Sequence, residues 1–171
     1  LWNIHSYFHD YTWTTLIFKR ADRDGGFVND SPVELLDIFP TVCTLAGIPK
    51  PDDLDGISLV PILEKKSEYL RDFAISQYPR RCNVMRSVIG RYPDDCTLMG
   101  YAVRNEKYRY IAWVSGDFED RSDFNNDEIV MEELYDYEID PLETKSYASD
   151  ASYQKVKEGM IKDLRSVIWE K

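Results

Sequence analysis

The stretch LMGYAVRNEKYRYIAWV, residues 98–114, decides the fold of the C-terminal half of the chain. It predicts two strands, 98–104 and 107–114, joined at Asn105-Glu106. Side chains alternate along a strand, so the second strand presents two sets of residues: Tyr108, Tyr110 and Ala112 on one face, and Arg109, Ile111 and Trp113 on the other.

Further elements flank this hairpin on both sides. The stretches FAISQY, residues 73–78, and ELYDY, residues 133–137, predict two more short strands. A C-terminal helix follows, which Asp150 or Ser152 can cap. Its apolar stripe consists of Tyr153, Val156, Met160, Leu164 and Val167. Strands followed by a helix predict a small antiparallel sheet packed on a C-terminal helix.

A second helix is predicted to begin at SPVE, residues 31–34. Ser31 suits the cap, Pro32 suits the first helical position and Glu34 completes a capping box. Gly47 is a natural stop. Apolar residues at helical spacing form the expected buried stripe: Val33, Leu36, Phe39, Cys43 and Ala46.

The N-terminal part offers too few strands for a sheet of its own. TTLIF, residues 14–18, predicts one buried strand, and a lone strand cannot complete its backbone hydrogen bonds. We therefore expect that strand to join a sheet supplied by chain outside this sequence. The chain is expected to be the C-terminal part of a larger α/β protein. Residues 1–65 would end an incomplete α/β domain, and residues 66–171 would form a C-terminal subdomain.

Composition narrows the classes of function. The 171 residues include 31 acidic and 21 basic side chains, a net charge of −10, which disfavours nucleic-acid binding. The sequence contains no apolar run of about 18 residues, so it predicts no membrane-spanning helix. Residues 80–109 nevertheless hold seven basic and three acidic side chains. Such a local excess either focuses an anionic small ligand or forms an ordinary solvated face.

No catalytic or metal constellation is complete in the chain. His5 and His9 have ligand spacing, but no third ligand accompanies them, and packing is the alternative. We therefore assign no catalytic residue and no metal ligand from the residues alone. Cys82 and Cys96 flank a polar stretch and could close a small disulfide loop in an oxidising compartment.

Three successive motifs resemble signatures of the sulfatase family, in the family's order. They are SPVELLDIFPTVCTLAGI at 31–48, LDGISLVPIL at 54–63 and ELYDYEIDPLET at 133–144. FAISQYPR at 73–80, followed by MGYAVRNEKYRYIAWV at 99–114, is similar to the iduronate-2-sulfatase branch in particular. The similarity covers nearly the whole chain.

The resemblance implies an alkaline-phosphatase-like α/β sulfatase fold, of which this chain is a C-terminal fragment. It implies hydrolysis of sulfate esters of glycosaminoglycan sugars, with a formylglycine nucleophile made from the Cys or Ser of a C-x-P-S-R motif and with calcium neutralising the sulfate. It also implies a sulfated glycosaminoglycan or sulfated sugar as partner, together with the remaining N-terminal part of the same protein. The expected location is lysosomal in an animal, and otherwise extracytoplasmic or secreted.

This sequence departs from the family pattern at the reacting centre. It contains no C-x-P-S-R, and the family's calcium ligands lie upstream of Leu1, so the fragment should be inert alone and bind no cofactor. Relatives carry W-x-K-[HY]-[ST], whose Lys contacts the sulfate; here Ile4 replaces that Lys. The resemblance places His5 near the sulfate and Tyr78 and Arg80 near the mouth of the pocket. Packing of His5 beside Trp2 is the alternative for His5, and an ordinary surface position is the alternative for Arg80. For the protein as a whole, the alternative is a catalytically inactive relative that only binds sulfated glycans.

Overall fold

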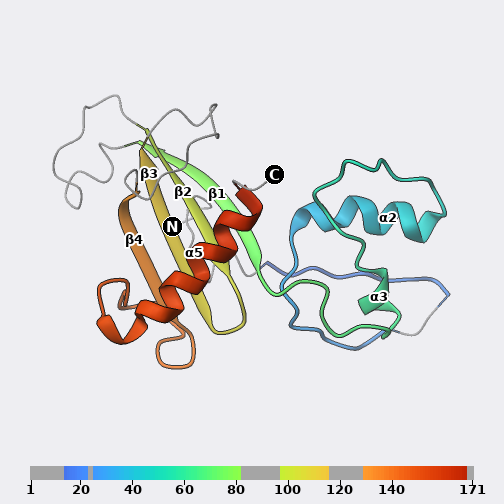
Figure 1. Cartoon of the computed structure of the whole chain (residues 1–171). Helices are drawn as coiled ribbons and strands as arrows, with labels where there is room; N and C mark the ends of the chain where they lie inside the picture. The colour runs from blue at the N-terminus through green and yellow to red at the C-terminus, as the bar shows by residue number, and fades with distance from the viewer. Residues whose placement is uncertain (1–13, 23–24, 82–96, 116–128, 169–171) are drawn as a thin grey trace. The chain divides into compact units, whose positions relative to one another are not determined.

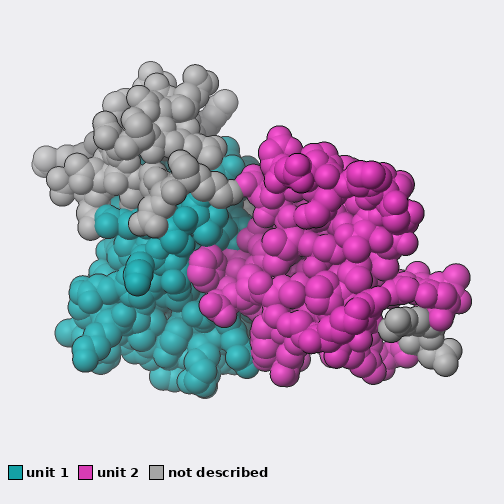
Figure 2. Space-filling view, turned by 45° about the vertical axis from the view of Figure 1, so that its right-hand side comes forward, with its two compact units in different colours: residues 1–13, 75–171 teal, residues 14–74 magenta. Residues whose placement is uncertain are grey.

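A computed structural model describes residues 14–22, 25–81, 97–115 and 129–168 (Figure 1). The chain divides into two compact units, which Figure 2 colours separately. One unit is Thr14–Ala74, and the other contains the described residues from Ile75 onward. In the described part of the chain, no helix has both the length and the apolar character that a membrane crossing requires.

A four-stranded sheet forms the centre of the C-terminal unit, in the order β1-β2-β3-β4. β2 and β3 pair antiparallel, as do β3 and β4. The predicted antiparallel sheet is therefore confirmed, although β4 begins four residues earlier than its sequence pattern indicated. The bounds are β1 Ala74–Arg81, β2 Thr97–Arg104, β3 Tyr108–Ser115 and β4 Ile129–Asp136.

The predicted turn between β2 and β3 is built by Asn105. Its side-chain oxygen accepts hydrogen bonds from the backbone N–H groups of Lys107, at 2.9 Å, and Tyr108, at 2.8 Å. The backbone N–H of Asn105 donates to the Tyr108 carbonyl at 3.0 Å. Asparagine favours such turns because its short side chain can satisfy neighbouring backbone donors. The turn thereby sets the register of the hairpin.

The C-terminal helix α5, Gln154–Ile168, lies across one face of the sheet (Figure 1). It follows the short helix η3, Ala151–Tyr153, which Asp150 caps as predicted by accepting from the Ser152 N–H. Met160 and Leu164 are buried. Lys157 pairs with Glu132 of β4 at 3.1 Å. Glu132 also accepts from Tyr110 of β3, so this face joins helix and sheet through polar as well as apolar contacts.

A buried ion pair fastens the loop after β4 to the sheet. Arg109 of β3 and Glu143 are almost fully buried and lie 2.7 Å apart (Nη2 to Oε2). Tyr137 donates to the other oxygen of Glu143 at 2.6 Å. Glu143 adopts a φ of 55°. Because such a conformation is unfavourable for a residue with a side chain, these contacts must hold the loop in place.

We predict that Glu143→Gln lowers the free energy of unfolding by about 3–5 kcal/mol, because it leaves the buried Arg109 charge without its counter-ion. Chemical denaturation of this chain measures the loss. The matched control is Glu138→Gln, which removes a solvent-exposed pair with Lys107. That control should cost about 1 kcal/mol or less. Equal losses for the two variants would contradict the importance of the buried pair.

The described residues of the N-terminal unit contain no strand inside the unit. They form three helical segments. They are η1 Leu35–Asp37, α2 Ile38–Ala46 and α3 Val60–Leu63. The helical region ends at Gly47, whose φ is 66°, as predicted. Its predicted start is wrong: Glu34 is the N-cap, and the Glu34 N–H donates to Asp37 at 2.8 Å. Ser31 instead lies before the helical region, and its N–H donates to the Asn29 side chain at 3.1 Å.

Asp37 holds this unit together. Its carboxylate is completely buried and receives the Ile57 N–H at 2.8 Å in addition to the Glu34 N–H. Arg71 pairs with the same carboxylate and lies 2.8 Å from Glu34. A buried carboxylate is tolerated when cations and N–H donors satisfy it. The start of the helix, the segment around residue 57 and the segment around residue 71 are therefore joined at one point.

Gly56 packs directly against the helix start beside Asp37. A Cβ added at Gly56 would lie 2.1 Å from the Leu36 carbonyl oxygen, a distance that forces backbone movement. The glycine of LDGISL is therefore required by a close approach of two backbones.

We expect Gly56→Ala to destabilise the N-terminal unit by about 2 kcal/mol or more, a loss typical of overpacking. The control is Gly159→Ala in α5, where nothing lies within 4 Å of an added Cβ. That control should stabilise the chain by about 1 kcal/mol. Thermal unfolding of both variants checks the prediction, and an unchanged midpoint for Gly56→Ala would refute it.

Two expectations for the N-terminal unit are wrong. Residues 14–18 form no strand in the described part of the chain, and Ile17 is 80% exposed. The stripe predicted for the second helix is only partly buried. Cys43 is a buried free thiol as expected, but Leu36 and Phe39 are more than half exposed. The sequence pattern located an apolar face correctly but assigned it to the wrong environment.

Candidate functional site

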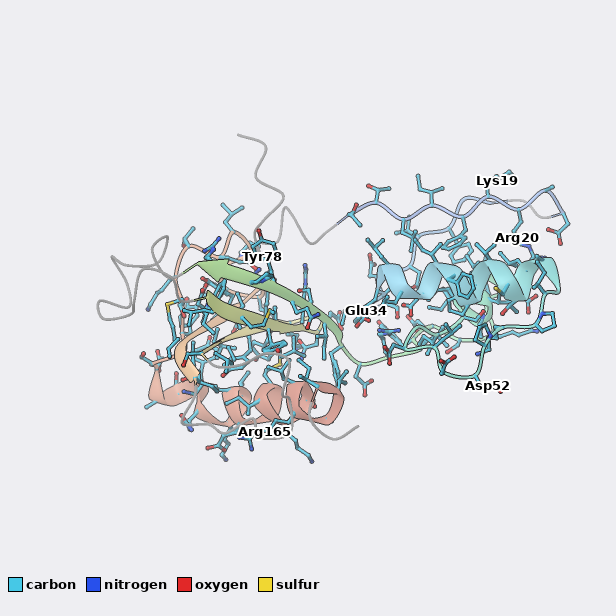
Figure 3. All side chains as sticks on the ribbon, turned by 90° about the horizontal axis from the view of Figure 1, so that it is seen from above. Lys19, Arg20, Glu34, Asp52, Tyr78 and Arg165 are labelled. Atoms are coloured by element: carbon cyan, nitrogen blue, oxygen red, sulfur yellow. The ribbon has the colours of Figure 1, made fainter. Side chains whose placement is uncertain are left out.

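Two of the predicted site residues lie on β1. Tyr78 and Arg80 are two positions apart, so they project from the same face of the strand. Figure 3 shows Tyr78 on the side of the sheet away from α5, the helix that carries Arg165. Both side chains are partly exposed. His5 and the two cysteines of the possible disulfide, Cys82 and Cys96, lie outside the described residues.

Arg80 of β1 stacks on an aromatic ring from β3, which is not a neighbouring strand in the sheet. Its guanidinium carbon lies 5.3 Å from the ring centroid of Trp113 in β3, although β2 runs between the two strands. The β2 residue opposite Trp113 is Gly100. Because Gly100 has no side chain, we infer that it leaves the room that this contact needs. Stacking of this kind stabilises and orients a guanidinium group.

A shared carboxylate orients the ring beneath Arg80. Glu133 of β4 accepts a hydrogen bond from Trp113 Nε1 at 2.8 Å on one oxygen. Its other oxygen accepts from the Tyr135 hydroxyl. Burial, followed by this hydrogen bond, raises the pKa of Tyr135 far above its usual value, so the hydroxyl remains a donor. The indole is consequently fixed in one orientation.

Tyr78 packs against the apolar cluster of the same face. The cluster contains buried residues from three strands, namely Leu98, Ala102, Ile111, Trp113 and Tyr135. Tyr78 therefore contributes to the packing of this face, and it lies two residues before Arg80 on the same strand. We call Tyr78, Arg80, Trp113 and Glu133 together the Arg80 site.

The chemistry of the Arg80 site suits recognition of an anion. A guanidinium group stacks through its flat face, and its N–H donors lie in the plane, where they can bind a carboxylate or sulfate in a fork. Among the described residues, no group of three or more His, Cys, Asp or Glu side chains could hold a metal ion.

Sequence reasoning missed the residues that support Arg80. The alternation along 107–114 had placed Trp113 on one face with Arg109 and Ile111. The structure confirms this grouping, because Ile111 and Trp113 pack in one cluster with Tyr135, and the Arg109 guanidinium lies 4.9 Å from the same Tyr135 ring. It did not pair Arg80 with Trp113, or Trp113 with Glu133. Strand order and register alone bring these residues together. The one available signal was Gly100, an isolated glycine inside a strand pattern.

Comparison with known proteins places the chain in a family. The family described as "N-sulphoglucosamine sulphohydrolase, C-terminal" matches residues 7–170. A "Delta 4,5-hexuronate-2-O-sulfatase" of Bacteroides thetaiotaomicron is 31% identical over 122 residues, which cover 71% of this chain and 20% of that protein. The "Iduronate 2-sulfatase" of Mus musculus is 29% identical over 153 residues, covering 76% of this chain and 27% of that protein.

A solved structure shares the architecture. It is a protein in complex with its substrate D-glucosamine-2-N,6-O-disulfate, with a TM-score of 0.52 and 25% identity. The similarity covers 76% of this chain and 22% of that one. The chain thus spans about a fifth to a quarter of the length of these proteins. The match of nearly all its residues shows that this chain belongs to the family of sulfatase C-terminal domains.

Proposed function

We propose that this chain is the C-terminal portion of a sulfuric ester hydrolase that removes sulfate from sulfated uronate sugars of glycosaminoglycans. Two of its relatives are named for cleaving sulfate from position 2 of a uronate. Arg80 is the observation that carries the proposal, since an oriented, partly exposed guanidinium suits a substrate carrying sulfate and carboxylate groups.

We propose different roles for the two parts of the whole protein. Formylglycine, calcium and the bond-breaking chemistry belong to the upstream part, and this chain is inert by itself. This chain contributes recognition: Arg80 binds an anionic group of the sugar, Tyr78 lines the same surface, and His5 lies near the sulfate. We further propose that residues 1–65 end the catalytic domain and residues 66–171 form the C-terminal subdomain. An oxidising compartment, lysosomal in an animal or otherwise extracytoplasmic, would suit a Cys82–Cys96 bridge.

Arg80→Ala in the full-length protein should reduce kcat/KM for a 2-sulfated uronate disaccharide about 10- to 100-fold, the value of a charge-assisted hydrogen bond. The loss should appear mainly in KM, because Arg80 holds the sugar at a distance from the reacting centre. Measurement of sulfate release gives both constants.

Lys155→Ala, which removes an exposed cation on α5, is the control and should leave both constants unchanged. Arg80→Lys keeps the charge without the fork and should lie between the wild type and Arg80→Ala. Wild-type kinetics for Arg80→Ala would remove Arg80 from the substrate site. Sulfate release by the 171-residue chain alone would contradict its proposed inertness.

A second function, binding of sulfated glycans without catalysis, is favoured by Ile4. Loss of a cation that stabilises developing charge costs orders of magnitude in rate. If the wild-type full-length protein binds heparan sulfate but releases no sulfate, Ile4→Lys should restore turnover while leaving glycan affinity within a few fold. Binding measured by calorimetry and turnover measured by sulfate release separate the two functions. Robust turnover by the wild type would exclude the binding-only function.

A further inference from the structure

We propose that Glu133 is a positioning residue of the Arg80 site: it raises the affinity of that site for an anionic group by holding Trp113, although its own charge repels the anion. The inference rests on the proposed function and deepens it, because it concerns how Arg80 is presented to a substrate. It gives Glu133 a role in binding that requires no contact with the substrate.

The register of the sheet brings Glu133 within reach of Trp113. Met131 is the β4 residue opposite Trp113, and Glu133 lies two positions further along the same strand. Glu133 is therefore a diagonal neighbour of Trp113 on the same face, at a separation that a long side chain can span. Its Oε1 accepts the indole N–H of Trp113 at 2.8 Å. A shift of one residue in the register would move Glu133 to the other face.

This hydrogen bond selects one orientation of the indole ring. Trp113 is only 2% exposed, so its N–H needs an acceptor inside the protein. A ring turned over about its side-chain axis would direct the N–H away from Glu133 and leave a buried donor unsatisfied. Arg80 stacks on the face of the same ring. Because the ring face supports the guanidinium, Glu133 determines the direction in which Arg80 presents its fork of N–H donors.

Glu133 is itself held from a second side. Its other oxygen accepts from the hydroxyl of Tyr135, a residue that is 6% exposed. The guanidinium carbon of Arg109 lies 4.9 Å from the centroid of the Tyr135 ring, and Arg109 is paired with Glu143. A continuous series of contacts thus connects the buried ion pair to Trp113. Supports of this kind reduce the cost of ordering a binding group.

The adjacent Glu132 has similar bonds but no connection to the Arg80 site. It projects from the opposite face of β4, accepts from the Tyr110 hydroxyl and pairs with Lys157 of α5. Each of the two glutamates therefore accepts a hydrogen bond from a tyrosine hydroxyl. Only Glu133 also holds the ring beneath Arg80. Glu132 is consequently a matched control for the loss of a carboxylate from this part of the sheet.

Charge and positioning predict opposite results at Glu133. If its charge alone mattered, removing a negative group near a bound anion would strengthen binding. If its hydrogen bond to Trp113 matters, removing the acceptor weakens binding. Glu133→Ala removes both the charge and the acceptor. Glu133→Gln removes the charge but keeps an oxygen for the indole N–H, and its amide can donate to the Tyr135 hydroxyl.

Glu133→Ala in the full-length protein should raise KM for a 2-sulfated uronate disaccharide about 2- to 10-fold, the net value of one hydrogen bond. Its kcat should stay within about 2-fold of the wild type, because the reacting centre is untouched. Glu133→Gln should have the wild-type KM or a lower one. Glu132→Ala should leave both constants unchanged. Sulfate release measures KM and kcat, and calorimetry measures Kd for the same disaccharide.

A double-mutant cycle tests whether the effect passes through Trp113 and Arg80. Trp113→Phe keeps an aromatic ring but has no N–H to orient. In the Trp113→Phe background, and separately in the Arg80→Ala background, Glu133→Ala should change KM by less than about 1.5-fold. An effect of Glu133→Ala that adds fully to that of Arg80→Ala would overturn the inference, because Glu133 would then act independently of Arg80.

Other outcomes also overturn the inference. One is a KM for Glu133→Ala that equals or falls below the wild-type value. Another is a KM for Glu133→Gln as high as that for Glu133→Ala, which would show that the acceptor is not what matters. If Glu133→Ala does not fold, Trp113→Phe removes the same hydrogen bond from the other side. Trp113→Phe should raise KM by a similar factor, and a wild-type KM for it would overturn the inference.

Failure of the proposed function is distinguishable from failure of this inference. If the full-length protein binds the disaccharide but releases no sulfate, only catalysis is refuted, and the same comparisons made in Kd test Glu133. If affinity depends on Arg80 but not on Glu133, only the inference is refuted. A wild-type protein that neither binds nor cleaves the disaccharide refutes both.

Discussion

Asp37 is the constraint on which the N-terminal unit depends. Its buried carboxylate gathers two backbone N–H groups and one guanidinium, and these partners come from three separate segments of the chain. A buried carboxylate without partners is strongly unfavourable, so the three segments must meet where Asp37 lies. The orientation of α2 follows from this one point. The polar side of the helix faces its own unit, and the apolar side faces outward.

The C-terminal unit uses buried or partly buried polar groups on both faces of its sheet. On the face covered by α5, Glu132 links Tyr110 to Lys157. On the opposite face, Arg109 is paired with Glu143. Polar pairs of this kind contribute less net stability than apolar packing, but they penalise wrong register because a displaced partner leaves a buried charge. The same logic orients Trp113 under Arg80, so structural order and the candidate recognition site share one layer of side chains.

The two units differ in how they bury their apolar side chains. The sheet and α5 have a hydrophobic core of their own, and Arg80 lies on one face of this sheet. The Thr14–Ala74 unit instead turns a broad apolar surface outward. We propose substrate recognition only for the first of these units, through Arg80. Membership in the sulfatase family agrees with this proposed role.

Local sequence determined most of the elements of this protein. Alternation along 98–114 predicted the β2–β3 hairpin and its two faces, Asn105 marked its turn, and helical spacing predicted α5, because these signals involve residues close in the chain. The stretch 31–48 predicted a helix ending at Gly47 and indicated the sulfatase family. Tertiary structure alone decided which side of that helix is inward, because Asp37 finds its partners at residues 57 and 71. It likewise decided that residues 14–18 form no strand and that Trp113 and Glu133 support Arg80, since these outcomes depend on pairing between distant segments.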